Sequence, residues 1–333
     1  MTRARRSSAS TSSATASAAP GSRAGTKRSS ARVRLIASDL DGTIVGHDGK
    51  ISARTVDAFA AARAAGVGIV FVTGRPPRWL DPLVDQLGHE GLVICSNGAV
   101  VYDLGQRRVL DRTTIAADDV YAARERIEQA FPDARFALES LAGFVVEPGF
   151  LDIESIELRE LAPQWIADVL PRRARVTDGV EEEIPDDESV VKFLAKHPTL
   201  TPDDFLGHVR GLVSDLVAVT HSSPGVALVE MAPQGIDKAV TLARYAERHG
   251  IDAGDVYAFG DMPNDRQMLR WAGHGYAMAS GHPEAREAAA NLAPPFDEDG
   301  VAQVIEGVLA SGHDADPPSP AAPSPEPQDP ARA

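Results

Sequence analysis

The order in which apolar runs and helical patterns follow one another constrains the fold of this chain most. Short apolar runs cover residues 33–38, 67–72 and 92–95, and helical patterns separate them. After a long interruption the same alternation resumes with an apolar run at 256–259. Strands that alternate with helices are typical of a parallel sheet covered by helices on both faces. The sequence therefore predicts an α/β fold whose core is a doubly wound parallel sheet.

The interruption has a pattern of its own. It predicts a helical stretch at 154–170 and a helix capped by Thr201, with short strands between further helices. This mixture is expected to form an α+β cap domain of residues 115–228, inserted into a Rossmann-like core of residues 33–114 and 229–310. The insertion has roughly 110 residues, which is the size of a small domain.

The two ends of the chain differ in composition from the rest. Residues 1–32 are rich in Ser and Ala, and residues 311–333 are rich in Pro. Such segments bury too little apolar area to offset the entropy of ordering, so both are expected to be disordered tails. A start site placed too early, or an Arg- and Ser-rich targeting peptide, is the alternative for the first tail.

Charge is distributed unevenly along the chain. Residues 1–34 carry eight Lys or Arg and no acid. Because the whole chain has a net charge of −15, the remaining residues together have a net charge of −23. A strongly acidic surface repels nucleic acid, because binding there depends on Lys and Arg that neutralise phosphates. There is no run of eighteen apolar residues, and the single cysteine, Cys95, lies in an apolar run. We therefore expect a cytoplasmic protein with no nucleic-acid, membrane or obligatory protein partner.

Residues with useful chemistry are concentrated where the apolar runs end. The first run leads into the segment Asp39-Leu40-Asp41-Gly42-Thr43. Residues two apart on an extended strand face the same side, so Asp39 and Asp41 can both face a ligand. Two close carboxylates repel unless a cation or proton lies between them, which suits Mg²⁺ and its preference for oxygen ligands. One carboxylate can then attack while the other handles a proton; the alternative is an Asp-rich turn.

Two further segments offer groups for a phosphate. Thr73 and Gly74 follow the second apolar run, where a hydroxyl and backbone N–H groups can hold phosphate oxygens. Lys238 lies early on a predicted helix at 236–249, and its ammonium could neutralise a phosphate and the carboxylate of Asp39. Taken singly, Thr73 could be a helix cap and Lys238 could face solvent.

The last segment, Gly260-Asp261-Met262-Pro263-Asn264-Asp265, again follows an apolar run. Asp261 and Asp265 add hard oxygen ligands for a metal, and Asn264 adds a neutral hydrogen-bonding group. An Asx turn that caps the helix at Pro263 is compatible with both roles. Ligands bind beyond the carboxyl ends of parallel strands, so these groups are expected to form one Mg²⁺ and phosphate site.

Together these segments resemble the Cof-type branch of the haloacid dehalogenase superfamily. The segments that carry the resemblance are Asp39-Leu40-Asp41-Gly42-Thr43, Thr73-Gly74-Arg75, Ser96-Asn97-Gly98-Ala99, Lys238 and Gly260-Asp261-x-x-Asn264-Asp265-x-x-Met268. The insertion matches the position and size of the large α/β cap of that branch. The resemblance implies a magnesium-dependent phosphatase of small phosphorylated metabolites, with sugar phosphates first and phosphorylated cofactors such as flavin mononucleotide or pyridoxal phosphate next.

The roles that the resemblance implies agree with the chemistry of the residues. Asp39 is the expected nucleophile and forms an aspartyl-phosphate, while Asp41 protonates the leaving oxygen and then activates water. Asp39, the backbone carbonyl of Asp41 and Asp261 are the expected ligands of Mg²⁺, with support from Asp265. The expected phosphate-binding and charge-stabilising residues are Thr73, Gly74, Asn264 and Lys238.

One segment departs from the pattern of the family. Where the family commonly has a Met-Gly-Asn-Ala turn, this chain has Met278-Ala279-Ser280-Gly281-His282-Pro283. His282, and the loop residue His47, are interpreted as surface histidines rather than ligands.

Two other functions stay open at this point. A sugar phosphomutase would return the phosphoryl group to a second hydroxyl of the sugar. A non-catalytic phosphosugar-binding regulator would use the same site without turnover.

Overall fold

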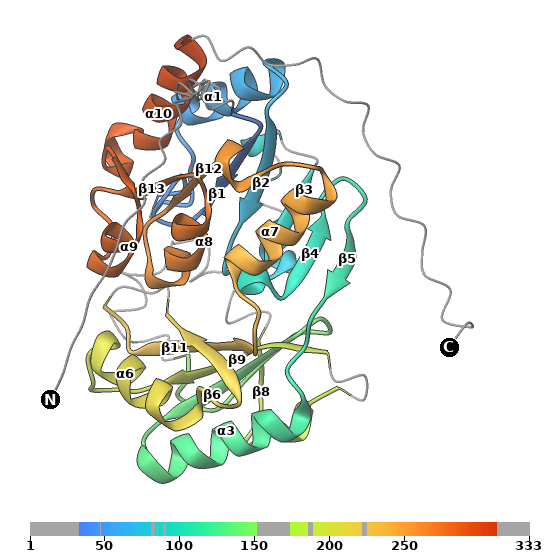
Figure 1. The fold of residues 1–333 in the computed structure, drawn as a ribbon. Helices are drawn as coiled ribbons and strands as arrows, with labels where there is room; N and C mark the ends of the chain where they lie inside the picture. Colours follow the sequence, from blue (N-terminus) through green and yellow to red (C-terminus); the bar gives the residue numbers. More distant parts are fainter. Residues whose placement is uncertain are drawn as a thin grey trace, which may run out of the picture. The chain divides into compact units, whose positions relative to one another are not determined.

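The computed structural model describes residues 33–311, except residues 47, 81–83, 85, 89–90, 152–173, 186–188 and 222–224. In this part of the chain the strands form two sheets, of eight and six strands (Figure 1). The first sheet contains, in spatial order, β14 (Asn291–Ala293), β13 (His274–Met278), β12 (Val256–Gly260), β1 (Leu35–Ser38), β2 (Gly68–Val72), β3 (Leu92–Cys95), β4 (Val100–Asp103) and β5 (Arg108–Arg112).

Strand β1 lies inside this sheet, between β2 and β12, and all three run parallel. The sheet continues through β3 on one side and through β13 and β14 on the other. The carboxyl end of β1 is therefore a topological switch point, where ligands bind in open α/β sheets. The predicted doubly wound parallel sheet is confirmed. The antiparallel strands β4 and β5 were not predicted, because most of their residues are charged or partly exposed.

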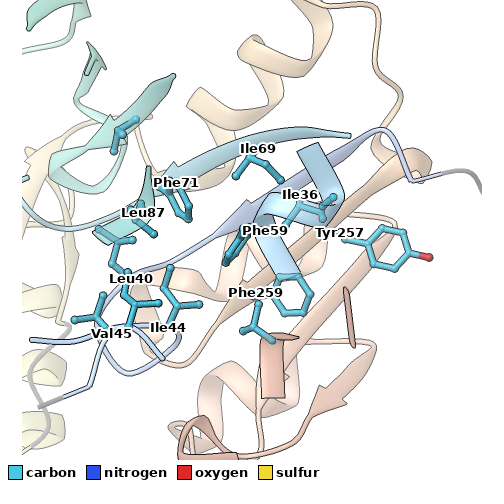
Figure 2. Packing of buried hydrophobic residues seen from close by; sticks show 14 of the residues in the cluster. Ile36, Leu40, Ile44, Val45, Phe59, Ile69, Phe71, Leu87, Tyr257 and Phe259 are labelled. Carbon is cyan, nitrogen blue, oxygen red and sulfur yellow. The ribbon is translucent and has the colours of Figure 1, made fainter. Parts of the chain in front are cut away.

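Successive side chains of β1 point to opposite sides of the sheet, and both sides are apolar. Helices therefore pack on both faces of the first sheet. Ile36 packs with Phe59 and Phe71 in the cluster that Figure 2 shows. The rings of Phe59 and Phe71 meet edge to face, with their centroids 5.3 Å apart. Leu35 packs on the other face with Leu242. Among the described residues, the helices around this sheet include α1 (Ala53–Ala64), α7 (Lys238–Arg248), α8 (Arg266–Trp271), α9 (Pro283–Ala288) and α10 (Gly300–Ala310).

The second sheet carries the residues of the insertion. Its strands, in spatial order, are β10 (Val217–Thr220), β11 (Leu228–Pro233), β9 (Val190–Lys196), β6 (Arg135–Ser140), β7 (Phe144–Val146) and β8 (Ala174–Val176). Helices α3 (Ala117–Ala130) and α6 (Pro202–Val213) pack on it through one apolar cluster. The side chain of Thr201 accepts from the N–H of Asp204 and caps α6, as the sequence predicts.

The end of the insertion needs a correction. The sequence places it at residue 228, but β11 pairs with β10 and β9, so the second sheet continues to Pro233. An apolar run is compatible with either sheet, and only the pairing partners of this strand assign it to the second one.

Other expectations lie outside the described residues. These are the helical stretch at 154–170, the tail at 1–32 and, apart from its first residue Ser311, the tail at 311–333. Within the ranges that the structure describes, no helix is long and apolar enough to cross a membrane.

Candidate active site

Four neighbouring strands lead into loops at the carboxyl edge of the first sheet. β1 leads into Asp39, β2 into Thr73, β3 into Ser96 and β12 into Asp261. The N–H of Asp39 donates to the carbonyl of Phe259 (3.0 Å), which extends the pairing of β1 with β12 to the start of the loop. The sheet thus brings the predicted strand ends to one place.

Lys238 is the cation at the centre of this site. It is the first residue of α7, follows the N-cap Asp237, and is fully buried. Its Nζ donates to Oδ1 of Asp39 (2.6 Å) and to Oδ1 of Asp265 (2.7 Å). Two residues that lie 199 positions apart in the sequence, Asp39 and Lys238, therefore form a buried ion pair.

Asp261 and Asp265 form a group of three buried carboxylates with Asp39. One oxygen from each lies within 4.8 Å of the others. Oδ2 of Asp265 accepts from the N–H groups of Asp261 and Met262 (both 3.0 Å), so it fixes the loop after β12. Oδ1 of Asp261 accepts from Oγ1 of Thr43 (2.8 Å), which ties this loop to the one after β1.

The charges of this group suit a divalent cation. Three carboxylates and one ammonium leave two negative charges in a buried place. Burial raises the pKa of Asp39, Lys238 opposes this, and Asp265 and Asp41 add to it, so that the pKa reaches about 7. Burial and the charge of Asp39 raise the pKa of Asp261 well above its usual range. A cation among these oxygens would offset both effects, so the donor set fits a hard divalent metal.

Asp41 faces Arg75 and is not one of the three carboxylates that face one another. Nε of Arg75 donates to Oδ2 of Asp41 (2.7 Å), and a second guanidinium N–H donates to Oδ1. The Asp41 side chain is 39% exposed, whereas Arg75 is buried. Arg75 belongs to the motif Thr73-Gly74-Arg75, but its contact with Asp41 was not predicted. Nothing in the sequence distinguishes a buried arginine from one on the surface.

The predicted phosphate-binding residues lie together around Asn97. Thr73 is buried, and its Oγ1 accepts from the N–H of Arg75 (3.1 Å). Nδ2 of Asn264 donates to Oδ1 of Asn97 (3.0 Å). A Cβ atom added to Gly74 would lie 3.2 Å from the same oxygen of Asn97, so the backbone passes close to this amide. Asn97 is a second motif residue whose part in the site the sequence did not reveal.

The histidine in the segment that departs from the family pattern caps a helix. Nδ1 of His282 accepts from the N–H of Glu284 (3.2 Å) at the start of α9, and its Nε2 lies 3.4 Å from Asp203. The side chain is partly buried rather than on the surface, and with Asp203 and His221 it forms a second group whose potential ligand atoms lie within 4.8 Å of one another. The other histidine, His47, lies outside the described residues.

Comparison with known proteins gives the family. The haloacid dehalogenase-like hydrolase family matches residues 36–305. The 5-amino-6-(5-phospho-D-ribitylamino)uracil phosphatase YwtE of Bacillus subtilis (strain 168) is 27% identical over 293 residues, 84% of this chain and 99% of that protein. Pyridoxal phosphate phosphatase YbhA of Escherichia coli (strain K12) is 27% identical over 267 residues, 78% of this chain and 92% of that protein.

A solved structure agrees with this family in its fold. A haloacid dehalogenase-like hydrolase from B. subtilis superimposes with a TM-score of 0.71 at 23% identity, over 82% of this chain and 99% of its own. The parallel sheet and the extent of the family match define a hydrolase of the haloacid dehalogenase superfamily, to which this chain belongs. Within it, the named relatives are phosphatases, and the chain is a phosphatase of the Cof-type branch. The resemblance seen in the motifs is confirmed.

Proposed function

We propose that this chain is a Mg²⁺-dependent phosphatase that hydrolyses small phosphomonoesters through an aspartyl-phosphate on Asp39. The observation that carries the proposal is the buried contact of Asp39 with Lys238, beside Asp261 and Asp265. A carboxylate in this setting is held in one orientation, next to a cation, at the switch point of the sheet. These are the requirements for a nucleophile that attacks a bound phosphate.

Asp39 and Asp261 are the carboxylates that would hold Mg²⁺, with the backbone carbonyl of Asp41. Asp265 would support them, because its carboxylate fixes the loop that carries Asp261. Bound Mg²⁺ would supply positive charge to the phosphate oxygens and reduce their repulsion of an attacking carboxylate.

Asp39 and Asp41 would divide the remaining chemistry. Lys238 holds Oδ1 of Asp39, which leaves Oδ2 to attack phosphorus. The bond from phosphorus to the leaving oxygen breaks, and that oxygen takes a proton from Asp41. Asp41 then accepts a proton from water, whose oxygen attacks the aspartyl-phosphate and releases phosphate from Asp39. The exposure of Asp41 suits proton exchange with substrate and water, and Arg75 holds it in place.

The phosphate group would be held by neighbouring donors. Because Oγ1 of Thr73 accepts from Arg75, its hydroxyl hydrogen is available to a phosphate oxygen. Asn264 uses one N–H of its amide on Asn97 and has a second to offer. Gly74 contributes close backbone, and Lys238 would offset the charge that develops during transfer.

The insertion, residues 115–233, would act as the cap that selects the substrate. It contacts the core beside the site, where Nζ of Lys192 on β9 donates to the carbonyl of Gly74 (2.8 Å). A cap that closes over its ligand excludes water until the intermediate forms. By their names, the relatives YwtE and YbhA act on a ribityl phosphate derivative of uracil and on pyridoxal phosphate. Sugar phosphates and phosphorylated cofactors are therefore the substrates that we propose.

Hydrolysis of p-nitrophenyl phosphate tests this function. We expect turnover with Mg²⁺, loss of turnover with a chelator, and recovery when Mg²⁺ is added in excess. A folded protein that shows no turnover, or the same turnover without metal, would contradict the proposal. A panel of phosphorylated metabolites with free phosphate as the readout would then identify the substrate; an isomerised sugar phosphate without free phosphate would indicate a phosphomutase.

Gly42 offers a test of the metal-binding group. Its φ is +79°, and a Cβ atom there would lie 2.4 Å from Oδ2 of Asp261. We expect Gly42→Ala to displace Asp261 and to weaken Mg²⁺ binding at least about tenfold, which corresponds to about 1.4 kcal/mol. Isothermal titration with Mg²⁺ measures this. Gly207→Ala on α6, where a Cβ meets open space, is the control, and equal Mg²⁺ affinity in both variants would count against the assignment.

The raised pKa of Asp39 predicts a pH-dependent response to Mg²⁺. Because the pKa is about 7 when folded and 3.8 ordinarily, folding favours the protonated form. In the metal-free protein that contribution is complete below pH 3.8 and is lost as the pH rises through about 7. Mg²⁺ must displace the proton, so its increase of the melting temperature should be larger at about pH 8 than at about pH 5.

Thermal denaturation with and without Mg²⁺ at the two pH values checks this expectation. Asp39→Asn removes the titrating group and should reduce the difference between the two pH values. An equal increase of the wild-type melting temperature at both would show that Asp39 does not titrate in this range.

A further inference from the structure

We infer that Glu230 and Lys192 are positioning residues for phosphate binding: Glu230 sets the direction of the hydrogen bonds through Asn97 and so turns an N–H of Asn264 toward the phosphate. The inference rests on the proposed function, because it describes how that site holds its phosphate. Neither Glu230 nor Lys192 belongs to the motifs that identify the family.

Four buried side chains form a chain of hydrogen bonds from the second sheet to the site. Nζ of Lys192 on β9 lies 2.5 Å from Oε2 of Glu230 on β11. Nδ2 of Asn97 donates to the same oxygen (2.7 Å), and Nδ2 of Asn264 donates to Oδ1 of Asn97 (3.0 Å). None of the four residues is more than 7% exposed, so solvent does not compete for these contacts.

The carboxylate gives this chain its direction. An ionised carboxylate accepts hydrogen bonds and cannot donate them, so Asn97 must turn its NH₂ group toward Glu230. Oδ1 of Asn97 then faces Asn264, whose amide must present Nδ2 to it. The reverse orientation of either amide would place two acceptors against each other in a buried site.

The direction decides what Asn264 offers to a phosphate. Its Nδ2 carries two hydrogens, one of which is used by Asn97. Phosphate oxygens accept, so an amide that is turned the other way would present its oxygen to them and repel the ligand. Among the described residues, Oδ1 of Asn264 has no donor. The orientation of this amide is therefore set from the side of Asn97 and Glu230.

Lys192 links the backbone of the site to the same series of hydrogen bonds. Besides Glu230, its Nζ reaches the carbonyl of Gly74 (2.8 Å), in the turn after β2. Lys192 and Glu230 lie on the second sheet, whereas Gly74 and Asn97 follow strands of the first. The contact between the insertion and the core thus fixes the phosphate-binding groups, and phosphate affinity should depend on it.

Glu230→Gln tests the inference, because the new amide can donate to Oδ1 of Asn97. The hydrogen bonds through Asn97 and Asn264 can then run in the opposite direction. We expect kcat/KM for p-nitrophenyl phosphate to fall about 10- to 100-fold, mainly through KM. The affinity for inorganic phosphate, measured by calorimetry in Mg²⁺, should fall by a similar factor. Unchanged KM and phosphate affinity in a folded Glu230→Gln variant would overturn the inference.

Exchanging the charge between the two positions should restore the direction. In the double variant Asn97→Asp with Glu230→Gln, the amide at position 230 donates to the carboxylate at position 97, which still accepts from Asn264. The φ of +55° at Asn97 is one that Asp tolerates. We expect the double variant to recover most of the lost affinity, whereas Asn97→Asp alone sets two carboxylates against each other and loses at least as much as Glu230→Gln. A folded double variant no better than either single variant would overturn the inference.

A second comparison does not depend on that rescue. If Glu230 acts through the amide of Asn264, then Glu230→Gln in an Asn264→Ala background should change phosphate affinity less than about twofold. The full loss in that background would show that Glu230 acts by another route. This measurement remains decisive if the charge-exchanged protein does not fold.

Glu147→Gln is the matched control for loss of a buried carboxylate. Glu147 is 7% exposed and accepts from Arg124 (3.0 Å) and from the N–H of Phe136 (2.9 Å), within the insertion. It should lower the melting temperature and leave KM and phosphate affinity unchanged. If the wild-type protein lacks metal-dependent turnover, the proposed function fails, whereas the phosphate calorimetry still tests the direction of the hydrogen bonds.

Discussion

Asp39→Asn is expected to abolish turnover of p-nitrophenyl phosphate while the protein stays folded. The amide has nearly the size of the carboxylate, and its oxygen can still accept from Lys238, so the packing around it is retained. It cannot attack phosphorus, however, and loss of a nucleophile from a group that acts as a unit costs about 10⁴-fold or more in kcat. Steady-state assays with Mg²⁺, together with a melting curve, measure both parts of this expectation.

Asp57→Asn is the control for the chemical change itself. Asp57 lies exposed on α1 of the same core, so this variant should keep the activity of the wild type within about twofold. Full turnover by Asp39→Asn would remove the proposed nucleophile, because no oxygen of an amide can form the intermediate.

Lys238→Met is expected to lower the free energy of unfolding more than any of the other substitutions proposed for this chain. The side chain of Lys238 is fully buried and pairs with Asp39 and Asp265. Removal of one partner from a buried ion pair leaves charge without compensation and lowers the free energy of unfolding by about 3–5 kcal/mol. The pKa of Asp39 lies far above its ordinary value even with the lysine present. At about pH 5 the variant can therefore protonate Asp39, which removes the charge left without a partner, so the loss of stability should be smaller than at neutral pH.

Urea unfolding of the metal-free protein at neutral pH and at about pH 5 measures these losses. Lys50→Met, at an exposed loop position, is the control and should change the free energy of unfolding by about 0.5 kcal/mol or less. A Lys238→Met variant as stable as the wild type at neutral pH would contradict the central position of this ammonium.

The core and the place of the site could be predicted because they depend on local order along the chain. Apolar runs that stop at polar residues specify parallel strands, and the topology of such a sheet collects their carboxyl ends at one edge. Asp39, Thr73 and Asp261 therefore come together in space as expected. The cap of α6 at Thr201 is equally local, since it involves a contact three residues away.

The pairing of Lys238 could not be predicted from local pattern. A lysine in the first turn of a helix resembles any exposed lysine, and what buries this one is the packing of the start of α7 against a loop of the core. A Cβ atom at Gly98 would lie 2.3 Å from the carbonyl of Asp237, so only glycine allows this approach. The contact is tertiary, and the motif identified the lysine without showing why it is buried.

The remaining features depend on which strands pair. Glu230 stands between Val229 and Met231, a pattern in which a polar residue is expected to face solvent, yet all three residues are buried. Its partners, Asn97 and Lys192, follow or belong to strands far away in the sequence. The same dependence on pairing explains why the end of the insertion had to be corrected to Pro233.

The most direct test of the central claim is to look for a phosphoryl group on Asp39. Asp41→Asn suits this test, because p-nitrophenolate leaves without a proton while hydrolysis of the intermediate needs Asp41 as a base. The variant is mixed with p-nitrophenyl phosphate and Mg²⁺, quenched in acid and digested, and its peptides are analysed by mass spectrometry. We expect one phosphoryl group on the peptide that contains Asp39, at that residue, and none when Mg²⁺ is omitted. Release of p-nitrophenol with Asp39 unmodified, or with the phosphoryl group on another residue, would contradict the account.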